Sequence, residues 1–195
     1  MTQDYWQNRY DTKATGWDLG AISPPIQAYI EHLIAKGVDK NSRILIAGAG
    51  NSHEAEYLHH QGFTQVIVVD IAQTPLENFA ERVPSFPKAY LIQTDFFELD
   101  PVDVQFDFII EQTFFCAIDP SLRPAYAKKM RSLLKNHGEL FGLLFDDDFA
   151  KNPPFGGHRA EYQSLFEQYF DQVSIEPCYN SIASRQGQEV FIRLA

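Results

Sequence analysis

The stretch Arg43-Ile-Leu-Ile-Ala-Gly48-Ala-Gly50-Asn-Ser52 predicts a buried strand that leads through a glycine turn into a helix. Further along, Val66-Ile-Val-Val-Asp70 predicts a second buried strand that ends in an acidic residue. Gly48 and Gly50 allow the backbone to turn tightly and to come close to a ligand. Asp70 follows Gly50 by 20 residues, a spacing typical of an acid that accepts hydrogen bonds from ribose hydroxyls. These two segments predict a nucleotide-binding β-α-β unit.

Strands and helices alternate on both sides of this unit. Before it, Ser23-Pro24-Pro25, a set of spaced apolar residues and Gly37 predict a capped amphipathic helix. The other predicted helices run from a Ser52 cap to Gly62, from Thr74 to about Arg82, from Pro120 to Asn136 with Gly138 closing it, and from about 159 to 170. The predicted strands lie near 43–48, 65–70, 89–94, 105–111, 139–145, 172–176 and 189–194.

This order of elements predicts an α/β fold. Strands separated by helices form parallel β-α-β units with right-handed crossovers, so the sheet is covered on both faces. The last two strands follow one another with only a Gly187 turn between them, so they pair antiparallel or lie at the edge. We expect a single doubly wound, Rossmann-like domain over residues 1–195, mostly parallel, with a reversed C-terminal strand.

Length and charge limit the classes of partner. The chain has 195 residues and is 45% hydrophobic, which suits one globular domain with a sizeable core. Its formal net charge of −10 disfavours nucleic acid and anionic membranes as partners. The basic residues Lys128, Lys129 and Arg131 lie in a helical pattern, where a solvated face is the favoured interpretation. The expected partner is a small molecule.

The cysteines and the apolar segments indicate the compartment. Cys116 and Cys178 are the only two cysteines, too few for a disulfide framework in a chain of this size, and they suit a reducing compartment. The sequence shows no apolar leader and no run approaching the roughly 18 apolar residues of a membrane span. We expect a cytoplasmic protein that is a monomer or a weak homo-oligomer.

Ligands of such sheets bind beyond the carboxyl ends of the strands. The candidate residues there are Gly48 to Ser52, Asp70, Asp95-Phe96, Glu111-Gln112 and Asp146 to Asp148. Asp146, Asp147 and Asp148 form an acidic run that could hold a metal or an amine, but a solvated turn is the favoured interpretation. Both tryptophans of the chain, Trp6 and Trp17, precede the first predicted strand. Because an exposed Trp is costly, residues 1–22 are predicted to form an arm that covers a ligand.

The ribose could belong to a dinucleotide or to S-adenosylmethionine, and three features favour the second. The third glycine of a dinucleotide fingerprint falls at His53, whose side chain is too large for that helix contact. Four residues after Tyr126 stands Met130, so a Tyr-x-x-x-Lys dyad for hydride transfer is missing there. Acids at several strand ends suit a cofactor that carries a sulfonium and an ammonium.

The chain resembles the thiopurine S-methyltransferase superfamily, and within it the thiol and halide methyltransferases of plants and their bacterial relatives. Matching blocks cover about residues 6 to 155. They are Trp6-x-x-Arg9-Tyr10, Thr15-Gly16-Trp17-Asp18-x-Gly20, Gly48-x-Gly50, Asp70-Ile71, Asp95-Phe96-Phe97, Phe106-Asp107, Thr113 to Pro120, Arg123-Pro124-x-Tyr126-Ala127 and Pro153-Pro154-Phe155.

The resemblance implies a seven-stranded methyltransferase sheet with a helical arm, and it implies roles for single residues. Trp6, Tyr10 and Trp17 would fold over S-adenosylmethionine, with Gly48 and Gly50 under its methionine half. Asp70 would hold the ribose, with Ile71 among the cofactor contacts, and Asp95 and Phe96 would frame the adenine. Glu111 and Gln112 would lie near the amino acid end and the transferred methyl, and Trp17 and Phe155 would wall the acceptor pocket.

Three positions depart from the family pattern. Asn51-Ser52 stands where another glycine is usual, Tyr10 replaces a third Trp, and Glu111 replaces the more usual Asp. The first departure could alter cofactor affinity, and the last could reshape the acceptor side.

The expected reaction is methyl transfer from S-adenosylmethionine to a small soft nucleophile, a thiol or sulfide, with halides and heterocyclic thiols as further candidates. No catalytic base is identified. His53 and His158 are the nearest candidates, but a structural or solvated role is favoured for both, and a buried filler role is favoured for Cys116. Two alternatives remain: a non-catalytic S-adenosylmethionine sensor and a nicotinamide-dependent oxidoreductase.

Overall fold

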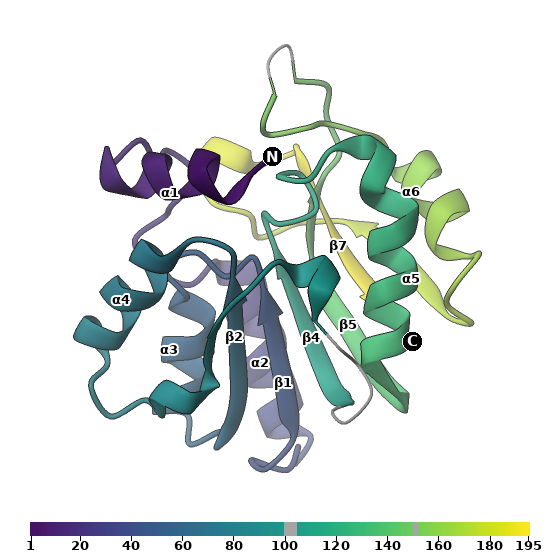
Figure 1. The fold of residues 1–195 in the computed structure, drawn as a ribbon. Helices are drawn as coiled ribbons and strands as arrows, with labels where there is room; N and C mark the ends of the chain where they lie inside the picture. Colours follow the sequence, from purple (N-terminus) through teal and green to yellow (C-terminus); the bar gives the residue numbers. More distant parts are fainter. Residues whose placement is uncertain (100–104, 150–151) are drawn as a thin grey trace.

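The computed structural model describes residues 1–99, 105–149 and 152–195, and its centre is one seven-stranded sheet (Figure 1). The strand order is β3-β2-β1-β4-β5-β7-β6. The strands are β1 (Arg43–Ala47), β2 (Gln65–Asp70), β3 (Leu91–Gln93), β4 (Phe106–Gln112), β5 (Leu134–Phe145), β6 (Val173–Pro177) and β7 (Glu189–Leu194). The α-helices are α1 (Gln3–Asp11), α2 (Pro24–Ala35), α3 (His53–His60), α4 (Gln73–Arg82), α5 (Arg123–Leu133) and α6 (Arg159–Phe166).

The direction of the strands confirms the predicted sheet. The pairs β3-β2, β2-β1, β1-β4 and β4-β5 are parallel, with Leu45 of β1 opposite Ile67 on one side and Ile109 on the other. Strand β7 is antiparallel to both of its neighbours, β5 and β6. The last strand is therefore the reversed one, and it lies between β5 and β6 rather than at the edge.

Helices cover both faces of the sheet, and the pleat of β1 shows how the core is divided. Leu45 and Ala47 pack into a cluster with residues of α5 and α6, including Tyr126 and Phe166. Ile44 and Ile46 point to the opposite face, into a second cluster built from α2, α3 and α4. Consecutive strand residues face opposite sides of a sheet, so a run such as Ile44-Leu-Ile-Ala47 must be apolar throughout. This explains the uninterrupted hydrophobic stretch that marks β1.

One predicted helix is too long. In place of a helix over 120–136, a 3-10 turn over Pro120–Leu122 leads into α5, and β5 begins at once at Leu134. Leu134 pairs with Phe106, and the register then shifts so that Glu139 pairs with Phe108. A Cβ at Gly138 would lie 2.7 Å from the carbonyl oxygen of Phe106. Gly138 therefore allows a bulge in a strand and does not end a helix, because long-range pairing overrides the local helical pattern.

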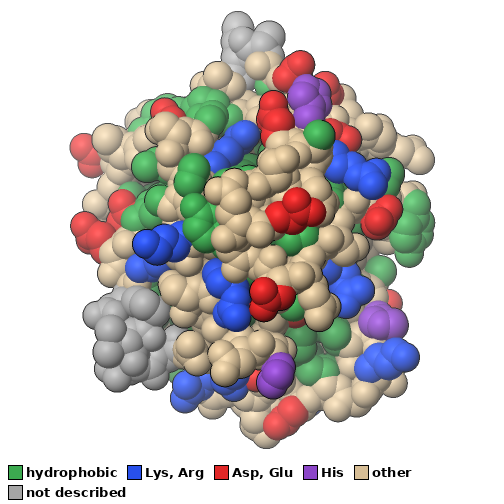
Figure 2. Space-filling model, turned by 90° about the vertical axis from the view of Figure 1, so that its right-hand side faces the viewer, with side chains coloured by type: hydrophobic (Ala, Val, Ile, Leu, Met, Phe, Trp, Pro, Cys, Tyr) green, Lys and Arg blue, Asp and Glu red, His purple; other side chains and the backbone are tan. Residues whose placement is uncertain are grey.

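The surface on the side of α5 and α6 carries mixed charge. Figure 2 shows acidic and basic side chains interspersed there, with hydrophobic side chains in separate groups. In the described parts of the chain, no helix is long and apolar enough to cross a membrane.

Candidate functional site

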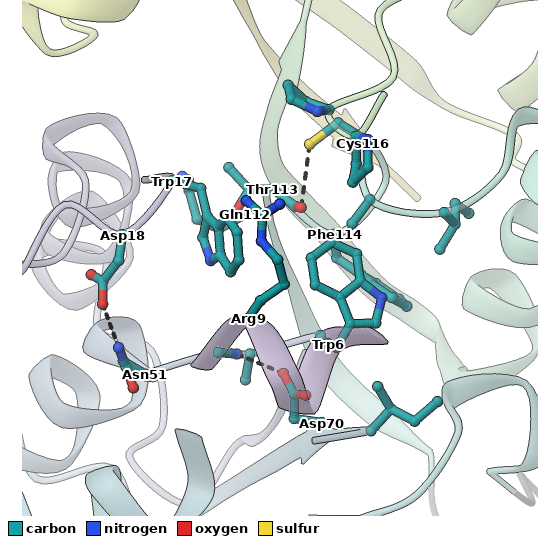
Figure 3. A pocket seen from close by; sticks show the side chains of 18 of the residues that line it. Trp6, Arg9, Trp17, Asp18, Asn51, Asp70, Gln112, Thr113, Phe114 and Cys116 are labelled. Carbon is teal, nitrogen blue, oxygen red and sulfur yellow. Dashed lines mark hydrogen bonds between the residues drawn. The ribbon is translucent and has the colours of Figure 1, made fainter. Parts of the chain in front are cut away.

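A cavity of about 510 Å³ opens at the carboxyl ends of β1, β2 and β4, and Figure 3 shows it from close by. Helix α1 of the N-terminal arm lies above these strand ends (Figure 1). Of the predicted site residues, Trp6, Tyr10, Trp17, Gly48, Gly50, Asp70, Ile71, Asp95, Phe96 and Gln112 all line it. The arm, the glycine turn and three strand ends therefore meet at one place, although they are spread over more than half of the sequence.

The two glycines of the turn are required by what packs against them. Gly48 and Gly50 have φ values of 58° and 53°, a region that side chains disfavour. A Cβ on Gly48 would lie 2.2 Å from the ring of Phe114, and a Cβ on Gly50 would lie 2.7 Å from the hydroxyl oxygen of Tyr10. The turn is thus shaped to receive one aromatic side chain from the arm and another from the loop after β4.

Asp70 is buried at the end of β2 and holds the glycine turn. Its Oδ2 accepts a hydrogen bond of 2.8 Å from the amide of Gly50, and its Oδ1 accepts one of 2.8 Å from the amide of Ala72. Desolvation raises the pKa of Asp70, while these amides act in the opposite direction. A carboxylate has about four acceptor positions, so Asp70 keeps acceptor capacity for a ligand in the cavity that it lines.

The arm places an aromatic cluster over the cavity. The ring of Trp17 meets Trp6 edge-on at 5.6 Å and Tyr10 edge-on at 5.8 Å. The guanidinium of Arg9 lies 4.9 Å from the centre of the Trp17 ring. Burial raises the pKa of Tyr10, and the charge of Asp70 acts in the same direction. The two tryptophans predicted to cover a ligand therefore pack on each other at the mouth of the site.

Gln7 fastens the arm to helix α4. Its Oε1 accepts a hydrogen bond of 2.8 Å from the amide of Gln73, and its Nε2 donates one of 2.5 Å to Oγ1 of Thr74. The N-cap residue of α4 is Ala72, which offers no side-chain acceptor. A free helix N-terminus leaves amides without partners, so Gln7, from helix α1, supplies the cap that α4 lacks.

We expect Gln7→Ala to lower the free energy of unfolding by about 1 kcal/mol, the usual cost of losing a helix cap. It should also weaken S-adenosylhomocysteine binding, since the arm loses its attachment beside Asp70. Urea unfolding and calorimetric titration measure the two effects. Gln3→Ala, which changes an exposed glutamine on the same helix, is the control. Equal stability and equal ligand affinity of the two variants would contradict the role of Gln7 in attaching the arm to α4.

A second fastening uses the residues that replace glycine in this turn. Asp18 of the arm accepts a hydrogen bond from the side-chain amide of Asn51, and its Oδ1 lies 2.8 Å from Nε2 of His53. The His53 contact is the main cause that lowers the pKa of Asp18. Ser52 precedes α3 as predicted, but its hydroxyl donates to the carbonyl of Gly50 and makes no cap. His53 thus ties the arm to α3, in keeping with a structural role.

Glu111 does not line the cavity, contrary to its predicted role as a cofactor contact. It is fully buried, and its Oε1 accepts hydrogen bonds of 2.8 and 2.9 Å from the amides of Phe114 and Phe115. Its Oε2 accepts the hydroxyl of Tyr126. Because neighbouring strand residues face opposite sides, Gln112 points to the cavity and Glu111 into the core. Glu111 orients the loop whose Phe114 ring covers Gly48.

Phe155 is the second correction. Its side chain does not line the cavity, which is bordered there by Pro153 and Pro154 instead. Its backbone is fixed on both sides: the amide donates to the carbonyl of Cys116 at 2.7 Å, and the carbonyl accepts from Arg123 at 3.3 Å. The segment Pro153-Pro154-Phe155 thus borders the cavity through its two prolines and not through Phe155.

Sequence reasoning missed Arg185, a buried cation in the wall of the cavity. Arg185, in the 3-10 turn Ala183–Arg185 before β7, lines the cavity and is 9% exposed. Its Nη2 donates to the carbonyl of Trp17 at 2.8 Å, and its guanidinium lies 5.4 Å from the centre of the Phe145 ring. Nothing in its local sequence marks Arg185, since 168 residues separate it from Trp17.

The acidic run after β5 has other partners. Oδ1 of Asp146 accepts from the amide of Arg159 at 3.0 Å, and the ring of His158 lies between Asp146 and Asp148, at 3.6 and 3.3 Å. Over residues 1–99, 105–149 and 152–195, no group of three or more His, Cys, Asp or Glu side chains is placed to hold a metal ion.

Comparison with known proteins shows the family to which this chain belongs. The model of the family described as thiopurine S-methyltransferase (TPMT) matches residues 1–191. The chain belongs to the thiopurine S-methyltransferase family. "Thiocyanate methyltransferase 1" of Brassica oleracea is 34% identical over 190 residues, with 94% of this chain and 81% of the relative covered. "Probable thiol methyltransferase 2" of Arabidopsis thaliana is 32% identical over 189 residues, with the same 94% and 81% covered.

Solved structures agree on the fold. A 1,6-didemethyltoxoflavin-N1-methyltransferase of Burkholderia thailandensis, solved with bound 1,6-didemethyltoxoflavin and S-adenosylhomocysteine, superposes with a TM-score of 0.77. It is 17% identical, and the match covers 98% of this chain and 85% of that one. The protein is a methyltransferase of the thiopurine S-methyltransferase family. A nicotinamide-dependent oxidoreductase and a non-catalytic sensor are thereby set aside.

Proposed function

We propose that the protein methylates a small soft anion, a thiolate or hydrosulfide in the first place, at the end of the cavity bordered by Trp17, Cys116, Phe145, Phe149 and Arg185. These five residues are called the acceptor wall. The observation that carries the proposal is the buried cation Arg185, set among aromatic rings and a thiol. The names of the relatives, a thiol and a thiocyanate methyltransferase, refer to acceptors of this same kind.

The rest of the cavity suits S-adenosylmethionine. Gly48 and Gly50 bring bare backbone to the cavity, where the methionine half would lie. Asp70 has acceptor capacity for the ribose hydroxyls, and Asp95 with Phe96 borders the side where the adenine would lie. When bound, the cofactor would supply a methyl group on a sulfonium. A thiolate can attack the carbon of this methyl group directly, with S-adenosylhomocysteine as the leaving group.

Arg185 is suited to hold an anion because its guanidinium, although paired with Glu189, has N–H groups beyond those that the protein engages. Its Nη1 lies 3.4 Å from Oε1 of Glu189, and one further N–H donates to Trp17. A guanidinium has five N–H donors, so several remain for a ligand. In a site that excludes water, the attraction between a cation and an anion is much stronger than in solvent. Arg185 would therefore favour the ionised form of a thiol over its neutral form.

Cys116 acts as an apolar part of the acceptor wall. Burial raises the pKa of Cys116 to about 12, so at neutral pH it is a thiol and not a nucleophile. Its Sγ lies 3.3 Å from the carbonyl oxygen of Thr113, to which the thiol donates. Phe145 and Phe149, which line the same cavity, meet edge-on at 4.9 Å. These groups give the nucleophile a dry surrounding, which, with in-line positioning, is what methyl transfer needs.

The experiment is S-adenosylhomocysteine release with sulfide, small thiols, thiocyanate, iodide, heterocyclic thiols and an amine. Turnover should be confined to the soft acceptors, and methylation of the amine alone would contradict the proposal.

With the best soft acceptor, Arg185→Met should raise the acceptor KM by about 10- to 100-fold, the range for losing a hydrogen bond to a charged group. The affinity for S-adenosylhomocysteine should change less than about threefold. Arg185→Lys, which keeps the charge, should recover part of the loss. Arg43→Met, at the opposite edge of the sheet, is the control. An unchanged acceptor KM in Arg185→Met would remove Arg185 from the acceptor site.

A further inference from the structure

A second cation in the cavity has no assigned role. Arg9 lies on α1 and lines the cavity. Its Nε donates a 2.9 Å hydrogen bond to the carbonyl of Ala14, and its guanidinium stacks on Trp17 at 4.9 Å. Within the described ranges it forms no ion pair, although the chain has 26 acidic against 16 basic residues. Its terminal N–H groups are placed to receive a ligand.

The direction of the side chain indicates which part of a ligand it would meet. Figure 3 shows Arg9 rising from α1 across the cavity toward Gln112 and Thr113, with the Trp17 ring beside it and Asp70 on the other side of α1. Gln112 and Thr113 stand at the end of β4. Arg9 therefore reaches over the β4 side of the sheet and away from β2.

The strand order converts this direction into a position on the cofactor. In the order β3-β2-β1-β4, Asp70 ends β2 and Asp95 follows β3. With the ribose at Asp70 and the adenine toward Asp95, as proposed above, the amino acid half extends the other way, over β1 and β4. Ligands of such sheets lie across the strand ends in this manner. Arg9 points into that half.

We propose that Arg9 binds the α-carboxylate of the methionine half of S-adenosylmethionine. The carboxylate is the anionic group of this cofactor, and Asp18, Glu54 and Asp70 in the cavity wall would repel it. A guanidinium can hold a carboxylate through two parallel hydrogen bonds. The same guanidinium stacks on Trp17, so carboxylate binding would also keep the arm in place over the cofactor.

The test compares two ligands that differ by the carboxylate alone, S-adenosylhomocysteine and S-adenosyl-3-thiopropylamine, in calorimetric titrations without any methyl acceptor. The wild-type protein should bind S-adenosylhomocysteine about 10- to 100-fold more tightly. Arg9→Met should remove that preference by weakening S-adenosylhomocysteine binding, with less than about a threefold change for the amine analogue. Arg9→Lys should keep a smaller preference. Arg43→Met, an exposed arginine at the far edge of the sheet, should keep all of it.

Two results would overturn the proposal. Equal wild-type affinities for the two ligands would show that the carboxylate is not recognised, whatever the variants do. Equal losses for both ligands in Arg9→Met would reduce Arg9 to a support for Trp17. Because no acceptor is present, the outcome does not depend on the proposed thiolate specificity, and failure of one proposal leaves the other standing.

Discussion

Asp70→Ala is expected to weaken S-adenosylhomocysteine binding by about 10- to 100-fold, because hydrogen bonds from ribose hydroxyls to a carboxylate contribute roughly 1.5 to 3 kcal/mol. Part of the effect is indirect. Asp70 also accepts the amides of Gly50 and Ala72, so the variant loses the contact that fixes the glycine turn under the ligand. Calorimetry gives the dissociation constant, and urea unfolding of the free protein gives the accompanying loss of stability.

Asp70→Asn separates the two effects, because an amide oxygen can still accept from one of the backbone amides while the negative charge is gone. Asp107 supplies the matched control: its Oδ2 accepts the amide of Arg43 at 2.8 Å, at the opposite edge of the same sheet. Asp107→Asn should therefore cost stability and leave ligand binding intact. A folded Asp70→Asn variant with wild-type affinity would take Asp70 out of the cofactor site.

The glycine turn and Asp70 could be located from sequence because their signals are local. A buried strand, two glycines and an acid at the end of the next strand follow one another within 28 residues, and parallel strands bring their carboxyl ends to one edge. The order of helices and strands in turn predicts the parallel sheet and its reversed last strand. The position of β7 between β5 and β6 was less accessible, because pairing partners are set by long-range packing.

The errors concern which way a side chain points. Glu111 and Gln112 both end β4, and only the pleat decides which of them faces the cavity. Phe155 was placed by its motif, whereas its side chain is turned by backbone contacts to Cys116 and Arg123. Arg185 was missed because its partner Trp17 is at the other end of the chain. For Phe155 and Arg185 the deciding contact is distant in sequence, whereas for Glu111 it is the phase of the strand pleat.

Glu111→Ala is expected to have the largest effect on stability, a loss of about 3 to 5 kcal/mol in the free energy of unfolding. The variant leaves the amides of Phe114 and Phe115 and the hydroxyl of Tyr126 without their acceptor in the core, and buried donors without partners cost about 1 to 3 kcal/mol each. It also opens a cavity. Urea unfolding measures the loss. Glu111→Gln is the control, and it should lose far less, since its amide oxygen can still accept from the two backbone amides and its NH2 can donate to the hydroxyl oxygen of Tyr126.

The charge of Glu111 gives this prediction a pH dependence of known sign. Burial raises the pKa of Glu111 to about 7 from 4.5, so between these values the unfolded chain has released the proton while the folded protein retains it. The free energy of unfolding therefore falls as pH rises through this window, by about 3 kcal/mol in total. Other groups titrate in the same range, but they are common to wild type and Glu111→Gln. The difference between the two should thus decline from pH 4.5 to 7 and then level off. A difference that stays flat or rises with pH would mean that the three donors outweigh burial and that Glu111 is ionised throughout.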